Sequence, residues 1–217
     1  LKVLIQLPLE YMITKQARKK LAAHKGLKIA IAGSFGKTSM REILKTVLSE
    51  GKKVSAPPHS YNTLPGISRF LKNLKGDEEV LIFELGEYYP GDILKLCNIV
   101  QPQLGIITGV NEAHLEKFKS LDKTVSTVFE LANWLGEDPL YINGESKLAK
   151  ENSSKKHIIY NREGIRGWKV ESSLADLTGT SFILALNGQR FKVKSKLLGL
   201  HQIGPLVAAI DISVRLG

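Results

Sequence analysis

Seven consecutive residues have the types and spacing that hold phosphate groups. The segment reads Gly33-Ser-Phe-Gly-Lys-Thr-Ser39. Glycines let the backbone turn tightly and approach an anion closely. A lysine in such a loop reaches the β- and γ-phosphates of a nucleotide, and a threonine hydroxyl can ligate Mg²⁺. We therefore predict that ATP with Mg²⁺ is the ligand, and that every residue of the loop contacts it: Gly33, Ser34, Phe35, Gly36, Lys37, Thr38 and Ser39.

The sequence on either side of this loop supports the interpretation. The apolar run 27–32 predicts a buried strand, and residues 40–49 predict an amphipathic helix. Backbone N–H groups and the dipole at the start of a helix both favour an anion. The spacing departs from G-x-x-x-x-G-K-[ST], because Ile31 stands where the first glycine would be. A chance Gly-Lys-Thr at a turn is the alternative, and the order of strand, loop and helix argues against it.

Two further side chains are candidate metal ligands at strand ends. Glu84 follows the apolar run 80–83, and a carboxylate beside a phosphate loop is a hard oxygen ligand for Mg²⁺. An ordinary surface glutamate is the alternative there. His114 follows the predicted strand 104–108 and is a candidate second metal ligand or phosphate contact. A structural or solvated histidine fits equally well. The predicted metal set is therefore Thr38, Glu84 and His114.

The order of predicted elements indicates an α/β protein. Strands alternate with helices up to about residue 155, which predicts a mostly parallel sheet with helices on both faces, as in P-loop NTPases. Ligands of such sheets bind at the carboxyl ends of the strands. Residues 1–26 are predicted to be a lead-in helix and linker, with helix over 9–24, and 27–217 to be the ATP-binding domain. Short β-like segments over about 156–195, with the hairpin signal Asn187-Gly188, predict a small antiparallel subdomain or an extension of the sheet.

Composition narrows the functional classes. The chain has 217 residues, a net charge of +10, and Cys97 as its one cysteine, which excludes an internal disulfide framework and fits the cytoplasm. No apolar run approaches the roughly 18 residues that span a bilayer. The basic residues of 1–26 fit a solvated helix face better than contact with nucleic acid or an anionic membrane. We expect a monomer with no nucleic-acid partner. Because the chain begins at Leu1 and ends in mid-pattern at Gly217, we expect it to be part of a longer polypeptide.

Several short motifs occur together in an order that resembles a known family. After the phosphate loop come Asn62-Thr63 with Gly66, Glu84-Leu-Gly86, Asn111-Glu-Ala-His-Leu-Glu116, Asn143-Gly-Glu145, and Gly199-Leu-His-Gln202 with Ala208-Ala209. This order resembles the central ATPase domain of the Mur ligases over about residues 27–217. The segments Phe83–Asp92 and His114–Phe118 resemble the branch that adds D-Ala-D-Ala to a UDP-MurNAc-peptide.

The resemblance implies an ATP-dependent amide ligase of peptidoglycan synthesis. Such an enzyme has a domain for the UDP-sugar before this one and a domain for the incoming amine after it, so this chain alone is expected to be inactive. The substrate carboxylate attacks the γ-phosphate of ATP, and the amine then attacks the acyl phosphate. The resemblance implies that Lys37 contacts the phosphates, that Thr38 and Glu84 hold one Mg²⁺, and that His114 holds a second. It also implies further binding residues: Asn62, Thr63, Asn111, His201 and Gln202.

Two departures from the family pattern bear on activity. Val128 stands where the family carries a carbamoylated lysine that ligates the second metal, and the following Glu130-Leu131 supports this register. Glu116 or Glu130 could supply the missing carboxylate, whereas Lys123 lies more than one helical turn away. Near the last helix, Gln202 and Pro205 replace asparagines that contact adenine.

Three other functions stay open. Val128 favours a nucleotide-binding paralogue without catalytic activity. Another ligase of this kind, such as a folylpolyglutamate or cyanophycin-type enzyme, shares the motifs. A P-loop NTPase acting on nucleic acid fits the charge, but no aromatic and basic stacking motif supports it.

Overall fold

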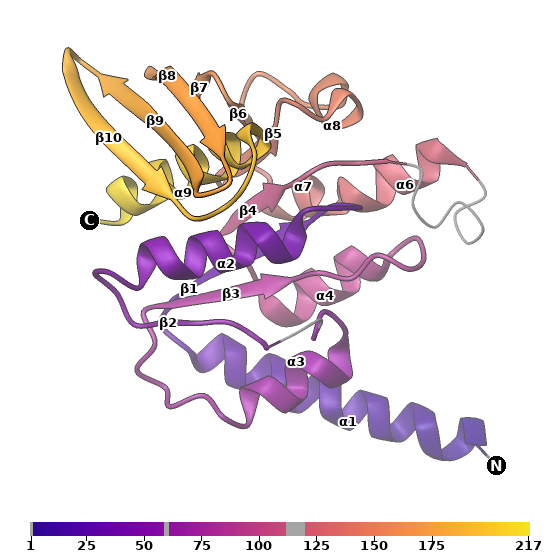
Figure 1. The fold of residues 1–217 in the computed structure, drawn as a ribbon. Coiled ribbons are helices and arrows are strands. Elements are labelled where there is room, and N and C mark those ends of the chain that lie inside the picture. The colour runs from indigo at the N-terminus through magenta and orange to yellow at the C-terminus, as the bar shows by residue number, and fades with distance from the viewer. Residues whose placement is uncertain (1, 59–60, 112–119) are drawn as a thin grey trace.

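The computed structural model describes residues 2–58, 61–111 and 120–217, and its main feature is a six-stranded parallel sheet (Figure 1). The strand order is β2-β3-β1-β4-β5-β6, so β1 lies between β3 and β4. The strands are β1 (Leu27–Ala32), β2 (Val54–Ser55), β3 (Val80–Glu84), β4 (Leu104–Ile107), β5 (Leu140–Asn143) and β6 (Ile158–Tyr160). The predicted α/β architecture is confirmed.

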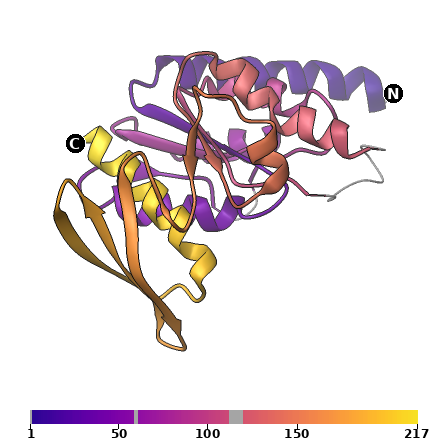
Figure 2. The same ribbon diagram turned by 90° about the horizontal axis from the view of Figure 1, so that it is seen from above.

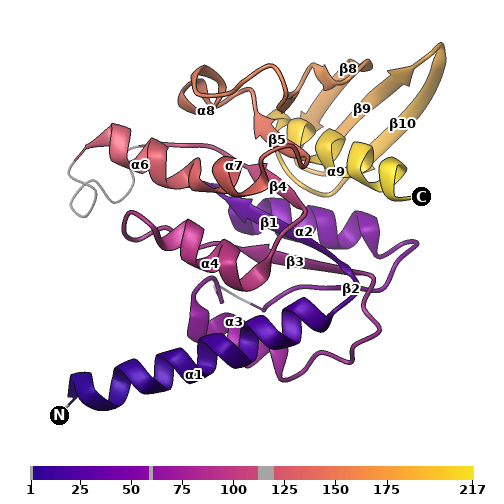
Figure 3. The ribbon, with the colours of Figure 1, turned by 180° about the vertical axis from the view of Figure 1, so that it is seen from behind.

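Helices cover both faces of this sheet. The central strands are apolar along their whole length because both faces are buried. One face packs against α1 (Lys2–Ala23), α3 (Leu64–Leu71), α4 (Asp92–Val100), α6 (Leu121–Val128), α7 (Glu130–Leu135) and α8 (Lys147–Glu151). The other packs against α2 (Lys37–Leu48) and α9 (Ile203–Leu216), which lie side by side (Figures 1 and 3). The one-turn 3₁₀ helix η1 (Leu200–Gln202) leads into α9.

A separate antiparallel sheet of four strands lies beyond α9, on the side of the molecule away from α1 (Figure 2). Its order is β10-β9-β8-β7, from β7 (Gly164–Ile165), β8 (Trp168–Asp176), β9 (Gly179–Leu186) and β10 (Gln189–Ser195). Positive φ angles at Asn187 and Gly188 make the predicted hairpin between β9 and β10. Phe182 and Leu184 anchor the sheet in the same apolar cluster as α2 and α9.

Three sequence predictions need correction. The segment 157–160 falls within the range 156–195 given for the antiparallel subdomain, but β6 pairs in parallel with β5 and extends the main sheet. The first helix, predicted over 9–24, begins at Lys2 and includes Pro8. Residues 120–135, for which the sequence pattern predicts one helix, form two helices, because Phe129 separates α6 from α7. Among the described residues, no helix combines the length and apolar character needed to cross a bilayer.

Candidate active site

The phosphate-loop segment connects the end of β1 to the start of α2. Gly36 adopts a left-handed conformation (φ 78°) immediately before α2 begins at Lys37. Gly33 has φ 139°, and a Cβ atom there would lie 2.4 Å from Thr108 Oγ1 and 2.8 Å from the Gly109 carbonyl oxygen. Glycine is therefore required at 33 for both its conformation and its space. The Ser34 N–H donates to the Gly109 carbonyl at 2.8 Å, which ties the loop to the end of β4.

Two residues outside the predicted set support the loop from neighbouring strands. Thr108 Oγ1 donates to the carbonyl oxygen of Phe35, and Asn143 Nδ2 donates to the Thr108 carbonyl oxygen at 2.8 Å. The loop is therefore fixed to the carboxyl ends of β4 and β5. Sequence analysis placed Asn143 in a motif but gave it no role. Within the described part of the chain, Ser34 Oγ is buried without a hydrogen-bond partner, so one polar atom of the loop is left for a ligand.

Glu84 and Thr38 meet beside the loop, as the sequence predicted. Glu84 is 4% exposed, and its Oε2 accepts a hydrogen bond from Thr38 Oγ1 at 3.1 Å. Its Oε1 lies 2.7 Å from Arg41 Nη1, and Arg41 is itself buried. Burial raises the pKa of Glu84 above its usual value, and the charge of Arg41 and the hydrogen bond from Thr38 offset this only in part. Two hard oxygen donors for a cation therefore lie within one hydrogen bond of each other.

Lys37 is held by a carboxylate that sequence analysis did not select. Its Nζ lies 2.8 and 3.0 Å from the two carboxylate oxygens of Glu87, and it also donates to the carbonyl oxygen of Gly33. The side chains of Lys37 and Glu87 are 14% and 3% exposed, so the pair is largely dry. Glu87 appeared in the sequence only as part of the motif after Glu84. Arg41 was not among the predicted site residues either, although it lies one turn after Lys37 on the same face of the helix.

The other predicted contacts are spread over several elements. Asn62 is buried and its carbonyl oxygen accepts a hydrogen bond from the Gly86 N–H at 2.9 Å. Thr63 precedes α3, and Asn111 is exposed beyond β4.

His114 and Glu116 lie outside the described residues, so the second metal ligand stays a prediction. Among the described residues no three His, Cys, Asp or Glu side chains gather as a metal cluster.

The position of the expected lysine is part of the apolar core. Val128 ends α6 and is fully buried in the cluster beneath α1 and α4. The neighbouring Glu130, a possible substitute metal ligand, has backbone partners in the structure. Its two oxygens accept hydrogen bonds from the N–H groups of Gly91 at 2.7 Å and Leu94 at 2.9 Å, so it caps the start of α4.

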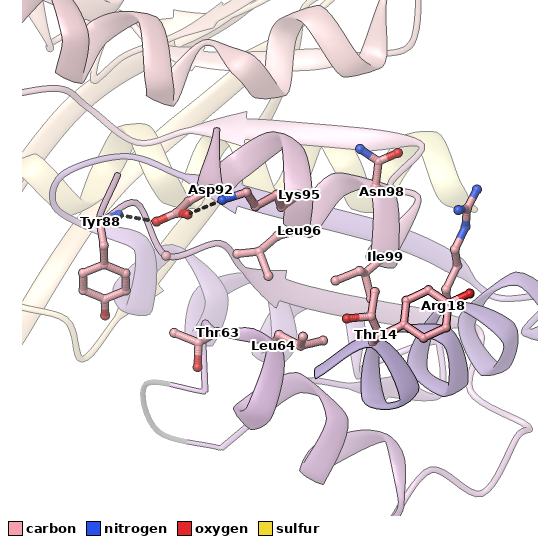
Figure 4. Close-up of a pocket in the computed structure, with 12 residues that line it drawn as sticks. Thr14, Arg18, Thr63, Leu64, Tyr88, Asp92, Lys95, Leu96, Asn98 and Ile99 are labelled. Atoms are coloured by element: carbon pink, nitrogen blue, oxygen red, sulfur yellow. Dashed lines mark hydrogen bonds and ion pairs between the residues drawn. The ribbon is translucent and has the colours of Figure 1, made fainter. Parts of the chain in front are cut away.

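Two cavities adjoin the site on opposite sides. One, of about 340 Å³, joins the phosphate loop to η1 and α9, and its lining includes Gly36, Asn143, Tyr160, His201, Gln202 and Pro205. The Tyr160 hydroxyl is buried there without a hydrogen-bond partner in the described structure. The other, of about 590 Å³, lies between α1, α3 and α4 (Figure 4), and its lining includes Thr63, Gly86 and Tyr88. The structure therefore brings His201 and Gln202 to the loop, as predicted.

A parallel α/β sheet with this loop, a strand-end carboxylate and flanking cavities defines a domain of the phosphate-loop class. The chain belongs to the Mur ligase family, because residues 31–212 match the model of the Mur ligase middle domain.

Relatives and solved structures agree with this assignment. The UDP-N-acetylmuramoyl-tripeptide–D-alanyl-D-alanine ligase of Borreliella burgdorferi is 28% identical over 99% of this chain and 45% of its own length. The ligase of the same name from Rickettsia prowazekii is 36% identical over 62% of this chain and 30% of its own length. The MurF ligase of Thermotoga maritima in complex with ADP superimposes with a TM-score of 0.81 at 25% identity, covering 96% of this chain and 49% of that one. MurF from Acinetobacter baumannii gives 0.83 at 22% identity, covering 96% and 47%. The chain thus spans less than half the length of these proteins.

Proposed function

We propose that this chain is the ATP-binding domain of a ligase that adds D-Ala-D-Ala to a UDP-MurNAc-peptide. The observation that carries the proposal is the loop 33–36 at the start of α2, with Thr38 and Glu84 hydrogen-bonded beside it. The names of the relatives supply the substrates, and the ADP complex of one similar structure supports the nucleotide. In this proposal the larger domain architecture of the relatives surrounds 27–217, and the protein acts on small molecules in the cytoplasm as a monomer.

The residues present fit Mg²⁺ and a nucleotide. Gly36 is exposed and left-handed immediately before α2, so the backbone at the start of that helix is open to an anion. Ser34 Oγ supplies a free polar atom, and Thr38 and Glu84 supply oxygens for a divalent cation. The cavity at His201 and Gln202 suits the base, with the ring of Tyr160 in its wall. Mg²⁺ bound there would neutralise phosphate charge and orient the phosphates.

In this proposal the residues of the chain position the phosphates and neutralise their charge. Lys37 and the N–H groups at the start of α2 hold the terminal phosphates where charge develops as the substrate carboxylate attacks. The cavity between α1, α3 and α4 is lined by Gly86 and Tyr88, which flank Glu87 in the sequence, and it is the proposed place for the acyl substrate. The bond from the γ-phosphorus to the ADP oxygen breaks as the acyl phosphate forms. The amine then displaces phosphate to give the amide.

Titration calorimetry on the chain tests the site. Lys37→Ala is expected to abolish measurable Mg²⁺–ATP binding, because it removes the cation at the phosphates. Lys53→Ala is the matched control, since Lys53 is 66% exposed and pairs with Asp77 at the surface. Unchanged affinity in Lys37→Ala would refute the assignment of the loop.

A second candidate is nucleotide binding without ligation, which the buried Val128 favours. The two are separated by assaying D-Ala-D-Ala addition in a polypeptide that carries this domain together with the flanking regions of the relatives. Turnover supports ligation, whereas nucleotide binding with no turnover supports the second candidate.

A further inference from the structure

The ion pair between Lys37 and Glu87 changes the charge that the phosphate loop offers to a ligand. Glu87 lies between β3 and α4, and both of its oxygens face the ammonium of Lys37 at 2.8 and 3.0 Å. A phosphate-binding lysine is useful when its charge is available to an anion. Here a buried carboxylate already balances that charge, and this would also hold the lysine against the loop.

A second cation near the loop is also neutralised by a buried carboxylate. Two cations of α2, Lys37 and Arg41, are each paired with a buried carboxylate, Glu87 and Glu84. The formal charge of this group of four is therefore zero. Because Glu87 is 3% exposed, little water screens its repulsion of an incoming phosphate oxygen. Free nucleotide would bring several negative charges beside the buried carboxylate of Glu87, whereas nucleotide carrying a divalent cation would bring fewer.

We propose that Glu87 is a specificity-determining residue that makes this loop select cation-bound nucleotide over free nucleotide. It acts by its charge, which pairs with Lys37 and repels an incoming phosphate oxygen. The inference rests on the proposed nucleotide site and adds to it, because the phosphate-loop residues alone favour any phosphate anion.

Calorimetry measures the affinity for ADP in the presence of Mg²⁺ and in the presence of EDTA. The proteins compared are the wild type, Glu87→Gln and Glu137→Gln. Glutamine keeps the shape of the side chain and removes its charge. We expect Glu87→Gln to tighten binding of free ADP at least about tenfold and binding of Mg²⁺–ADP by less, so the preference for the Mg²⁺ form falls. Glu137→Gln removes the same charge from a side chain that is 92% exposed and pairs with Lys156 at the surface, and it is expected to leave both affinities unchanged.

Equal changes in the two affinities, or no change, would overturn the proposal. Glu87→Asp keeps the charge and is expected to keep the wild-type preference, so loss of the preference in that variant would also overturn it. The aspartate variant keeps the test decisive if the glutamine variant does not fold. Failure of the wild type to bind Mg²⁺–ADP at all would instead refute the proposed function.

Discussion

Removing the guanidinium of Arg41 isolates the charge of Glu84 and gives a quantitative test of the site's electrostatics. Arg41 Nη1 lies 2.7 Å from Glu84 Oε1, and the two side chains are 6% and 4% exposed. Arg41→Met keeps most of the apolar length of the side chain. It leaves Glu84 buried with the hydroxyl of Thr38 as its polar neighbour.

The expected loss of unfolding free energy is about 3–5 kcal/mol at pH 7.5, which is the usual result of removing one partner of a buried ion pair. Arg41 also contacts Glu42, but that carboxylate is 55% exposed and returns to solvent at a cost of roughly 0–1 kcal/mol. Burial already raises the pKa of Glu84 in the wild type, and the variant raises it further because the cation is gone. The folded state then takes up a proton more readily than the unfolded chain. The destabilisation is therefore largest above the folded pKa of Glu84 and disappears as pH falls towards the unfolded value near 4.5.

Urea unfolding of Arg41→Met at pH 7.5, 6.5 and 5.5, followed by circular dichroism and fluorescence, measures this dependence. The double variant Arg41→Met/Glu84→Gln is expected to regain much of the lost stability, since no isolated charge remains. Arg190→Met is the control, because Arg190 is 69% exposed and its pair with Glu171 contributes about 1 kcal/mol at most. A loss that is the same at every pH, with no recovery in the double variant, would refute the reasoning and indicate a packing defect.

Two further predictions concern the loop and the core beside it. Gly33→Ala is expected to lower the free energy of unfolding by about 1–3 kcal/mol because of its φ of 139°, and by more because its Cβ would lie 2.4 Å from Thr108. It is also expected to abolish nucleotide binding. Thermal unfolding and calorimetry measure both effects, with Gly51→Ala as the control, because a Cβ there meets nothing within 4 Å. A Gly33→Ala protein that binds Mg²⁺–ATP normally would contradict the need for glycine. Val128→Lys is expected to lower stability by at least about 2 kcal/mol, because the position is fully buried among apolar side chains and offers the ammonium no water. A fully stable Val128→Lys protein with a higher ligase rate would instead show that the position opens towards the metal site.

The sequence predicts those parts of the site that depend on neighbouring residues or neighbouring strands. The strand, loop and helix around Gly33 are local in sequence, so glycine and apolar patterning suffice to find them. Thr38 and Glu84 meet because β1 and β3 pair in parallel with Ile31 opposite Glu84, which places the two strand ends together. A run of alternating strands and helices already implies such neighbours.

The sequence does not predict which of several nearby groups a side chain contacts in the folded protein. Glu87 stands in an irregular segment, where no period indicates which way its side chain points, so its pairing with Lys37 had no sequence signal. The sequence offers Glu130, beside Glu116, as a possible substitute metal ligand. It does not reveal the contacts of Glu130 with Gly91 and Leu94, because any residue could provide those backbone N–H groups. The sequence does not decide which sheet the short strand β6 joins, because three apolar residues fit either a parallel or an antiparallel pairing.

The two buried ion pairs explain how α2 can begin with so much positive charge. Lys37 and Arg41 are four residues apart, so they share one face of the helix and repel each other. Both also stand near the positive end of the helix dipole, where cations are unfavourable. Glu87 and Glu84 offset these repulsions. A phosphate ligand would offset them too, and so it competes with the carboxylates for the same cations. The charges that stabilise α2 without ligand are therefore the ones that would set how strongly the loop discriminates between phosphate ligands of different charge.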